Sequence, residues 1–381
     1  MTTSFQNVIA DRHKYARQWK ARTGGKVIGY FCTWLPEEIV YAAGILPVRI
    51  LGSHEPQEMA ERHISSMYCP LCRDCLAQGL SGKYDYLDGI IGPFSCLHIR
   101  QTFASWKTHV PLEYSYYLYV PTIGHHAAAK PFWVKQLTKF KASLEEWTKK
   151  PITDDDLDKS INVYNTNRRY LRQIYDLRKD DFPPVSGAEC MEMVVSSQLA
   201  DKAEHNVWLK SAYHEFSTKK ERKDPGIRLM ILGSENDDTE FVRLIESLGA
   251  TVVIDDHCTG SRYFWNYVMP KEDRLSAIAS RYLNRPACPA KDITQERRRF
   301  KHIPKLAKDF RAQGAILIQQ KFCDPHEFDL PRIKKRLEEQ GTPTLFLEFD
   351  VTTPVGQFKT RVEAFLEMMR QQDLFDDEDL L

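Results

Sequence analysis

The sequence has no long hydrophobic run and no excess of charge of either sign. No apolar stretch approaches the ~18–20 residues that a helix needs to span a bilayer. Residues 1–26 are polar and basic and lack the apolar core of a signal peptide. The 53 Lys and Arg residues nearly balance the 52 Asp and Glu residues, so the net charge of +1 gives no general attraction to nucleic acid or lipid. We therefore expect a cytoplasmic protein that binds neither membranes nor nucleic acid.

Nucleotide-binding motifs are also missing. No G-x4-G-K-S/T loop occurs in the chain, and the run from Gly233 to Asn236 lacks the spacing of a G-x-G-x-x-G dinucleotide motif. ATP chemistry is therefore expected on a different polypeptide. This absence also argues against a free-standing dehydrogenase.

The length and the pattern of the chain predict more than one lobe. Its 381 residues exceed the ~250–300 at which single hydrophobic cores stop growing. Strand and helix signals alternate over residues 1–130 and again over 224–372, while residues 131–223 show helical spacing of apolar side chains. We predict an α/β fold with two doubly wound, parallel-sheet lobes of the Rossmann or flavodoxin type, joined by a helical segment. The acidic residues 373–381 are expected to form a frayed tail.

The expected elements repeat in the two lobes, which look like two copies of one architecture. Short connections between alternating strands and helices favour parallel sheets. We expect strands at Val27–Phe31, Ile45–Leu51, Tyr86–Ile91, Tyr117–Val120, Arg228–Gly233, Thr251–Ile254, Ala315–Gln320 and Pro343–Glu348. We expect helices at Pro36–Gly44, Leu71–Gly82, Leu97–Thr108, Asp238–Leu248, Leu330–Gln340 and Val355–Met369.

Nine cysteines in a cytoplasmic chain are better explained as thiols or metal ligands than as disulfides. Cys69, Cys72 and Cys75 have the C-x2-C-x2-C spacing of bacterial ferredoxins. That motif needs a further Cys followed by Pro, and the chain has Gly79 at this point. A zinc site would need a second pair of ligands, and no matching pair is evident. The remaining possibility is a metal cluster assembled from distant segments.

Two further cysteines occupy positions where open α/β sheets bind their ligands. Cys96 and Cys323 each follow a predicted parallel strand, and the carboxyl ends of such strands form binding crevices. Cys32 and Cys258 also follow predicted strands, so position alone does not select the ligands. On this pattern alone, the cysteines are about as well explained as small buried thiols of the core as they are as metal ligands.

Several motifs occur in order from about residue 27 to 350. They are Thr33–Arg49, Cys69–Gly79, Ser95–Arg100, Asp255–Arg262 and Lys321–Pro325. Taken together, these motifs resemble the benzoyl-CoA reductase and 2-hydroxyacyl-CoA dehydratase family. Cys-Arg-Asp-Cys-Leu-Ala-Gln-Gly and Ser-Tyr-Tyr-Leu look most similar to the smaller cluster-bearing subunit (gamma) of ATP-dependent benzoyl-CoA reductases.

The resemblance implies a cofactor and its ligands. The three ligands of a [4Fe-4S] cluster in this family correspond to Cys69, Cys96 and Cys323, and the arginine that follows the first ligand is Arg73. Three thiolates leave one iron without a protein ligand, which in this family is thought to hold a non-protein ligand or to contact substrate. The other cysteines of the first motif have no counterpart there, and are either spare thiols in a helix or ligands that change the cluster type.

The resemblance also implies a reaction and partners. It implies an iron–sulfur subunit of an anaerobic, ATP- and ferredoxin-dependent benzoyl-CoA reductase, which dearomatises benzoyl-CoA to a cyclic dienoyl-CoA. The implied partners are a larger homologous cluster-bearing subunit, ATP-hydrolysing activator subunits, a low-potential ferredoxin and the acyl-CoA substrate. A dry, thiolate-rich pocket poor in positive charge would disfavour extra electrons on the cluster. Alternatives are a 2-hydroxyacyl-CoA dehydratase subunit with a ketyl radical mechanism, a non-catalytic electron-relay subunit and a zinc-bound structural module.

A few other side chains are candidates for chemistry. His98 is the candidate proton donor, because imidazole transfers protons near neutral pH; alternatively, it faces solvent or bonds to the backbone. Glu37 and Glu38 are acid–base candidates, but the helix dipole alone favours acidic residues in a first turn. The loop Thr259–Arg262 resembles one that holds a CoA phosphate, or is a plain turn. The stretch Glu113–Tyr119 lines a pocket or an interface, or forms an edge strand.

Overall fold

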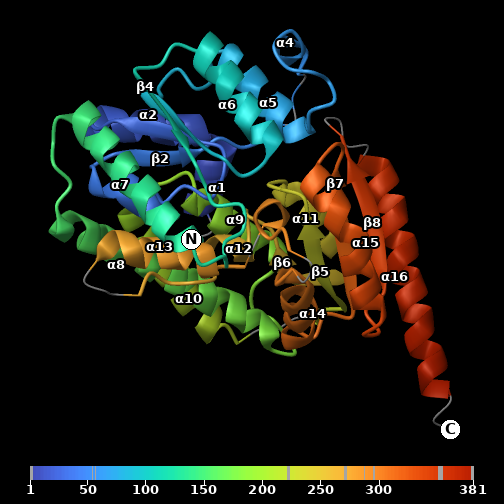
Figure 1. Cartoon of the computed structure of the whole chain (residues 1–381). Helices are drawn as coiled ribbons and strands as arrows, with labels where there is room; N and C mark the ends of the chain where they lie inside the picture. Colours follow the sequence, from blue (N-terminus) through green and yellow to red (C-terminus); the bar gives the residue numbers. More distant parts are fainter. Residues whose placement is uncertain are drawn as a thin grey trace.

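The computed structural model describes residues 3–53, 55, 57–220, 224–269, 273–286, 288–294, 297–350 and 355–378. Within these residues, the strands form two four-stranded sheets in which all neighbouring strands are parallel (Figure 1). The strand orders are β2-β1-β3-β4 and β6-β5-β7-β8, so both sheets have the same arrangement. These findings confirm the predicted α/β class with two parallel-sheet lobes and a helical segment between them.

The first sheet pairs short strands whose residues are almost all buried. Its edge strand β4 begins at Tyr114, three residues earlier than expected, because Tyr114 pairs with Gly89 of β3. The stretch of tyrosines is therefore an edge strand. The first lobe contains α1 (Thr3–Ala10), α2 (Arg12–Thr23), β1 (Val27–Tyr30), α3 (Glu37–Ala42), β2 (Leu46–Arg49), α4 (Glu58–Glu61), α5 (Pro70–Leu80), β3 (Gly89–Pro93), α6 (Leu97–His109) and β4 (Tyr114–Leu118).

Two helices of the helical segment begin at strong capping signals. Thr153 and Ser186 each form a capping box with the acidic residue three positions later. These helices do not stand apart from the sheets, since α7 packs on β4 and α9 packs on β6. The division at residues 130 and 223 stays a prediction, and residues 221–223 lie outside the described part. The helices are α7 (Ala129–Thr148), α8 (Asp154–Asp176), η1 (Leu177–Lys179), α9 (Gly187–Ser197) and α10 (Lys202–Thr218).

The second lobe repeats the parallel arrangement and adds helices that the sequence pattern did not indicate. Helix α15 begins at Asp324, two turns earlier than expected, because Pro325 is compatible with the first turn of a helix. The elements are β5 (Ile227–Gly233), α11 (Thr239–Ser247), β6 (Ala250–Asp256), α12 (Ser261–Phe264), α13 (Arg274–Asn284), η2 (Pro289–Lys291), α14 (Arg299–Asp309), β7 (Gly314–Gln320), α15 (Asp324–Glu338), β8 (Thr344–Phe349) and α16 (Val355–Glu378).

Side chains that alternate along a strand pack into separate hydrophobic clusters on the two faces of the sheet. Val27 joins one hydrophobic cluster and Ile28 another, because successive residues of a strand face opposite sides of the sheet. Leu229 of the second sheet belongs to the same cluster as Val27, so one continuous core joins the two lobes. Tyr282 of α13 lies in the cluster on the other face of the first sheet, so the last third of the chain also stabilises the first lobe.

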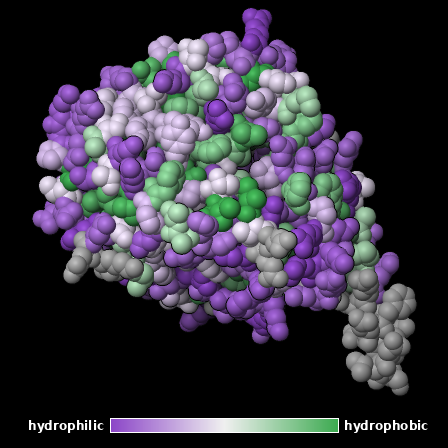
Figure 2. Space-filling view, in the orientation of Figure 1, coloured by the Kyte–Doolittle hydropathy of each residue, from purple (hydrophilic) through white to green (hydrophobic). Residues whose placement is uncertain are grey.

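The surface and the end of the chain give two further findings. Figure 2 shows a mostly hydrophilic periphery, with hydrophobic side chains gathered toward the middle of this face. No described helix combines the length and the low polarity that a membrane span requires. Helix α16 continues to Glu378, so residues 373–378, expected to be frayed, are helical. Residues 379–381 of the predicted tail lie outside the described part.

Candidate functional site

A cavity lies between the carboxyl ends of the strands of both sheets. Its walls include Cys32 after β1, Ser95 after β3, Ser234 after β5 and Cys323 after β7. In each sheet the order in which the chain adds strands reverses between two of these strands, β1 and β3 in the first sheet and β5 and β7 in the second. Open α/β sheets bind ligands at such points. The cavity volume is about 100 Å³, whereas one water molecule needs ~10–15 Å³ on the same definition of volume. The cavity therefore has room for a group of many atoms.

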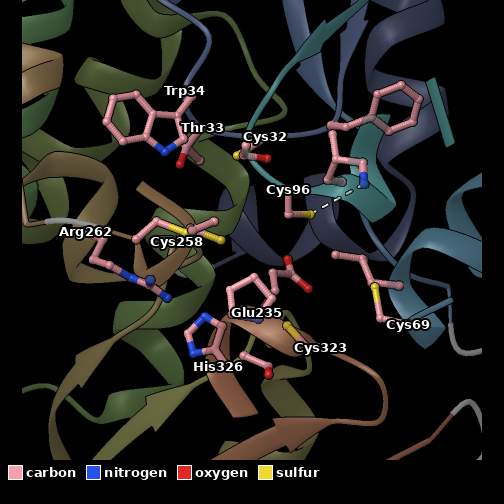
Figure 3. Close-up of a pocket in the computed structure, with 18 of the residues that line it drawn as sticks. Cys32, Thr33, Trp34, Cys69, Cys96, Glu235, Cys258, Arg262, Cys323 and His326 are labelled. Carbon is pink, nitrogen blue, oxygen red and sulfur yellow. Dashed lines mark hydrogen bonds between the residues drawn. The ribbon is translucent and has the colours of Figure 1, made fainter. Parts of the chain in front are cut away.

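The three predicted ligands all line this cavity, and each caps the N-terminus of a helix. Cys69 is the N-cap residue of α5, Cys96 that of α6 and Cys323 that of α15. Figure 3 shows these cysteines around the cavity, from three separate segments. A helix N-terminus favours negative charge by about 0.3–1 kcal/mol. Three such termini converge where a thiolate-bound cluster would lie.

Burial keeps these thiols protonated when no metal is bound. Contact with Cys72, followed by burial, raises the pKa of Cys69 well above its usual range. Burial also raises the pKa of Cys96 and of Cys323. The Cys96 Sγ accepts a hydrogen bond from the Ile99 N–H at 3.5 Å. Metal binding at this site would therefore release protons.

The arrangement of donors distinguishes a cluster from a single ion. Among the described residues, no three His, Cys, Asp or Glu side chains are placed to hold one metal ion. A four-iron cluster requires less convergence, because each thiolate binds a different iron. Thiolates are soft ligands that favour zinc, copper(I) and iron–sulfur clusters. The presence of three cysteines in the lining of one cavity is compatible with a cluster.

A second pocket lies on the outer side of the same three cysteines. Its volume is about 410 Å³ on the same measure, and Cys69, Cys96 and Cys323 are the cysteines that line it. Much of the remaining lining is apolar, and Leu97 and Phe328 are strongly exposed there. The three predicted ligands thus line both a smaller inner cavity and a larger, apolar outer pocket.

Comparisons with known proteins agree with this geometry. The family described as 2-hydroxyglutaryl-CoA dehydratase, D-component, matches residues 32–369. The chain belongs to this family. Its members carry iron–sulfur clusters. The matched residues include all three predicted ligands and every described strand except β1.

Relatives in the dehydratase D-component family align with nearly the whole chain. A benzoyl-CoA reductase subunit of Thauera aromatica is 29% identical over 90% of this chain and 90% of its own length. The (R)-phenyllactyl-CoA dehydratase beta subunit of Clostridium sporogenes is 27% identical over 96% of this chain and 97% of its own length. The (R)-2-hydroxyglutaryl-CoA dehydratase beta subunit of Acidaminococcus fermentans is 28% identical over 96% and 98%, respectively. The resemblance seen in the motifs is thus confirmed at the level of the family.

The candidate proton donor His98 lines the outer pocket rather than the inner cavity. Its Nδ1 accepts a hydrogen bond of 3.1 Å from the Cys69 N–H, and its ring lies 4.7 Å from that of Tyr68. Burial lowers the pKa of His98, while Asp324 opposes this shift. This finding agrees with the alternative in which the imidazole bonds to the backbone. A catalytic role stays a prediction.

The two extra cysteines of the first motif lie in different environments. Cys72 lines the inner cavity, whereas Cys75 does not, and its Sγ lies 3.7 Å from the Ile50 carbonyl oxygen. A cysteine at position 79, where a ferredoxin loop has its fourth ligand, would not fit the packing. The Cβ of any side chain at Gly79 would lie 2.7 Å from the buried ring of Trp106.

The cavity is richer in positive charge than expected. Arg49, Arg262 and Arg285 line it, and each is at most 4% exposed. The prediction of a pocket poor in positive charge is therefore wrong, because these side chains reach the cavity from three separate segments of the chain. The loop after β6 is buried at Thr259 and Arg262, and Arg262 lies 3.7 Å from Asp256.

Other candidate residues serve the fold. Glu38 is fully buried and forms an ion pair with Arg168, and Glu37 lies 3.7 Å from Lys202. Neither glutamate lines the cavity or the outer pocket. Arg73 donates to the Tyr68 carbonyl oxygen at 2.9 Å and is likewise absent from both linings.

Some site residues gave no clear signal in the sequence. Cys288 and Arg285 follow no strand, and both reach the cavity from the segment between α13 and η2. Glu235 directly follows Ser234 at the end of β5 and lies 3.3 Å from Arg49. Its place after a buried strand was the one signal by which it could have been found.

Proposed function

We propose that this chain is a cluster-bearing subunit of an acyl-CoA reductase or acyl-CoA dehydratase complex, with a [4Fe-4S] cluster on Cys69, Cys96 and Cys323. One observation carries the proposal: three cysteines cap three helices at the carboxyl ends of two parallel sheets, around one cavity. Such a cluster, when bound, would supply low-potential electrons for an acyl-CoA substrate. The chain's own residues hold it, stabilise its charge and limit its contact with water.

The helix termini and the apolar walls define what the protein contributes. The positive ends of the helix dipoles at the starts of α5, α6 and α15 would stabilise the negative charge of bound thiolates. The outer pocket provides an apolar surface against Cys69 and Cys96, and its volume falls in the range typical of ligand sites. We place the acyl group of the thioester in this outer pocket, because an aromatic or aliphatic acyl group matches its lining.

Within this class, we favour benzoyl-CoA reductase as the specific activity. The reductase relative of Thauera aromatica supports this choice, as do the motifs around Cys69 and the tyrosines of β4. The reaction would be the dearomatising reduction of benzoyl-CoA to a cyclic dienoyl-CoA. The pocket formed beside Phe94 and Phe328 suits a planar ring.

The proposed partners follow from what the chain lacks. Its sequence contains neither a G-x4-G-K-S/T loop nor a G-x-G-x-x-G motif, so ATP-hydrolysing activator subunits would supply the energy for electron transfer, with a low-potential ferredoxin as the upstream donor. A larger homologous cluster-bearing subunit would complete the enzyme, and the complex would act in the cytoplasm. The relatives are themselves subunits, which supports a heteromeric assembly.

A second candidate function is the dehydration of a 2-hydroxyacyl-CoA by a ketyl radical mechanism. The beta subunits of two such dehydratases cover 96% of this chain, at identities similar to that of the reductase relative. The chain could also act as an electron relay in either complex. Turnover of benzoyl-CoA but not of hydroxyacyl-CoA by the assembled complex would establish the reductase. Acyl-CoA that contacts only the partner subunit would establish the relay.

The ligand assignment is tested by paired cysteine variants. Cys323→Ser should lose the iron and sulfide of the four-iron cluster, because serine is a poor substitute for a thiolate. Cys190→Ser should keep them, because Cys190 is buried in a separate core and does not line the cavity. Iron and acid-labile sulfide are measured on anaerobically purified protein. Equal loss from both variants would contradict the proposal.

A further inference from the structure

A second set of three cysteines lines the inner cavity and is not used by the proposed cluster. Cys32 follows β1, Cys258 follows β6, and Cys288 caps η2. All three are half-buried, and none of them lines the outer pocket. In Figure 3, Cys258 lies on the opposite side of the cavity from Cys69. The cavity therefore has a thiol-bearing inner wall that faces the first set of cysteines.

Two buried arginines lie against this inner wall. The Arg49 Nη2 donates to the Cys258 Sγ at 3.0 Å and lies 3.3 Å from Glu235. Arg262 lines the cavity and lies 3.7 Å from Asp256. Arg299 lies 3.1 Å from the same carboxylate. Arg299 also lies 3.4 Å from Asp329. The described lining of the cavity contains three arginines and one carboxylate, Glu235, so it has fewer anions than cations.

A third buried arginine has no carboxylate beside it in the described part of the chain. Arg285 is 4% exposed, and its contacts among the described residues are with a backbone carbonyl oxygen and two aromatic rings rather than with a carboxylate. Its Nη1 donates to the Thr33 carbonyl oxygen at 2.8 Å, its guanidinium lies 4.4 Å from the Trp34 ring centre, and its Nε has no hydrogen-bond partner among these residues. An unpaired buried charge is costly. This charge faces a cavity with thiols on its walls, and thiolates would offset it.

We propose that Cys32, Cys258 and Cys288 form a second set of thiolate ligands, which holds additional iron and sulfide on the inner wall of the cavity. The neighbouring guanidinium groups of Arg49, Arg262 and Arg285 offset the negative charge of this second group. The proposal goes beyond the four-iron cluster of the proposed function. If it fails, the first ligand set is unaffected.

The geometry and the ligand chemistry identify the class of metal group. Thiolates select soft metals, of which zinc, copper(I) and iron–sulfur groups are the common examples. A single zinc or copper ion needs its ligands close together, and no such group of three exists among the described residues. Iron–sulfide distributes its thiolates over several irons. The space between Cys258 and Cys69 belongs to one cavity, so the second group lies next to the first or is continuous with it.

The test is the amount of iron and acid-labile sulfide bound per chain after anaerobic reconstitution. We expect the wild-type chain to bind clearly more than the four irons and four sulfides of a single cluster. The double variant Cys258→Ser, Cys288→Ser should fall to about the content of one four-iron cluster and keep its electron paramagnetic resonance signal. Cys190→Ser is the matched control, since that thiol is buried away from the cavity, and it should bind as much as wild type.

Two outcomes would overturn the proposal. The first is a wild-type chain that binds no more than one four-iron cluster, which needs no variant and is independent of folding. The second is a double variant that keeps the full wild-type iron content. The second outcome would be complete if the double variant Cys96→Ser, Cys323→Ser also lost all iron. Iron binding would then depend on the first ligand set alone, and the second ligand set would be refuted.

Discussion

The backbone N–H of Cys69 donates a hydrogen bond of 3.1 Å to Nδ1 of His98. This bond links the N-cap of α5 to the first turn of α6, where Cys96 is the N-cap. Because Nδ1 accepts, the neutral imidazole carries its proton on Nε2. The histidine therefore fixes the backbone next to one proposed ligand, and its remaining N–H is the group available for proton transfer.

Replacement of His98 separates these two roles. Asn places an amide oxygen near the position of Nδ1, so His98→Asn should keep the bond to the Cys69 N–H and the iron content. His98→Ala leaves this N–H without its acceptor, and we expect a loss of about 1–3 kcal/mol in unfolding free energy and a lower iron content. Iron analysis and urea unfolding of both variants test this. Equal iron content in both would contradict the positioning role.

Cys75 provides a prediction about the extra thiols of the first motif. Its Sγ lies 3.7 Å from the Ile50 carbonyl oxygen, outside the inner cavity. Cys75→Ala should therefore keep the full iron content, with a loss of roughly 1 kcal/mol in stability from the weak hydrogen bond and lost packing. Cys72 lines the cavity, so Cys72→Ala is the informative comparison. Loss of iron from the Cys75 variant would show that this thiol is a ligand.

The sequence predicted the strands and two site cysteines for local reasons. Buried runs such as Arg228–Gly233 end at glycine or polar residues, so the positions after them fall at the carboxyl edge of a sheet. Cys96 and Cys323 were placed there correctly. The pattern of residues within a strand cannot show that the carboxyl edges of the two sheets face each other. That depends on the shared core that joins Val27 with Leu229, which is a contact between distant segments.

Part of the inner wall of the cavity was not predictable in the same way, although Cys32 and Cys258 follow predicted strands. Cys288 and Arg285 lie between α13 and η2, in a segment without strand periodicity. Their position follows from the packing of α13 against the first lobe, and from the hydrogen bond between Arg285 and the Thr33 carbonyl, 252 residues apart. The selection of Cys69 among the cysteines of its motif came from family resemblance and not from spacing.

A buried ion pair holds the helical segment against the first lobe. Glu38 of α3 is fully buried, forms an ion pair with Arg168 of α8, and accepts a hydrogen bond of 3.0 Å from the Tyr282 hydroxyl. Glu38→Ala leaves a buried guanidinium unpaired, so the unfolding free energy should fall by about 3–5 kcal/mol. Glu363→Ala, which breaks an exposed pair with Lys359, should cost less than about 1 kcal/mol in the same urea titration. Similar losses would contradict this account.

His205 should make stability depend on pH. The ring is fully buried between Asn167 and Ser196, and burial followed by the charge of Lys202 lowers its pKa far below the usual value. The unfolded chain takes up a proton near pH ~6.5, so below this pH the unfolded state binds more protons and the folded state loses stability. This single group should contribute up to about 1.4 kcal/mol per pH unit. In urea unfolding between pH 7 and 5, His205→Gln should show a smaller decrease than wild type; parallel decreases would refute the assignment.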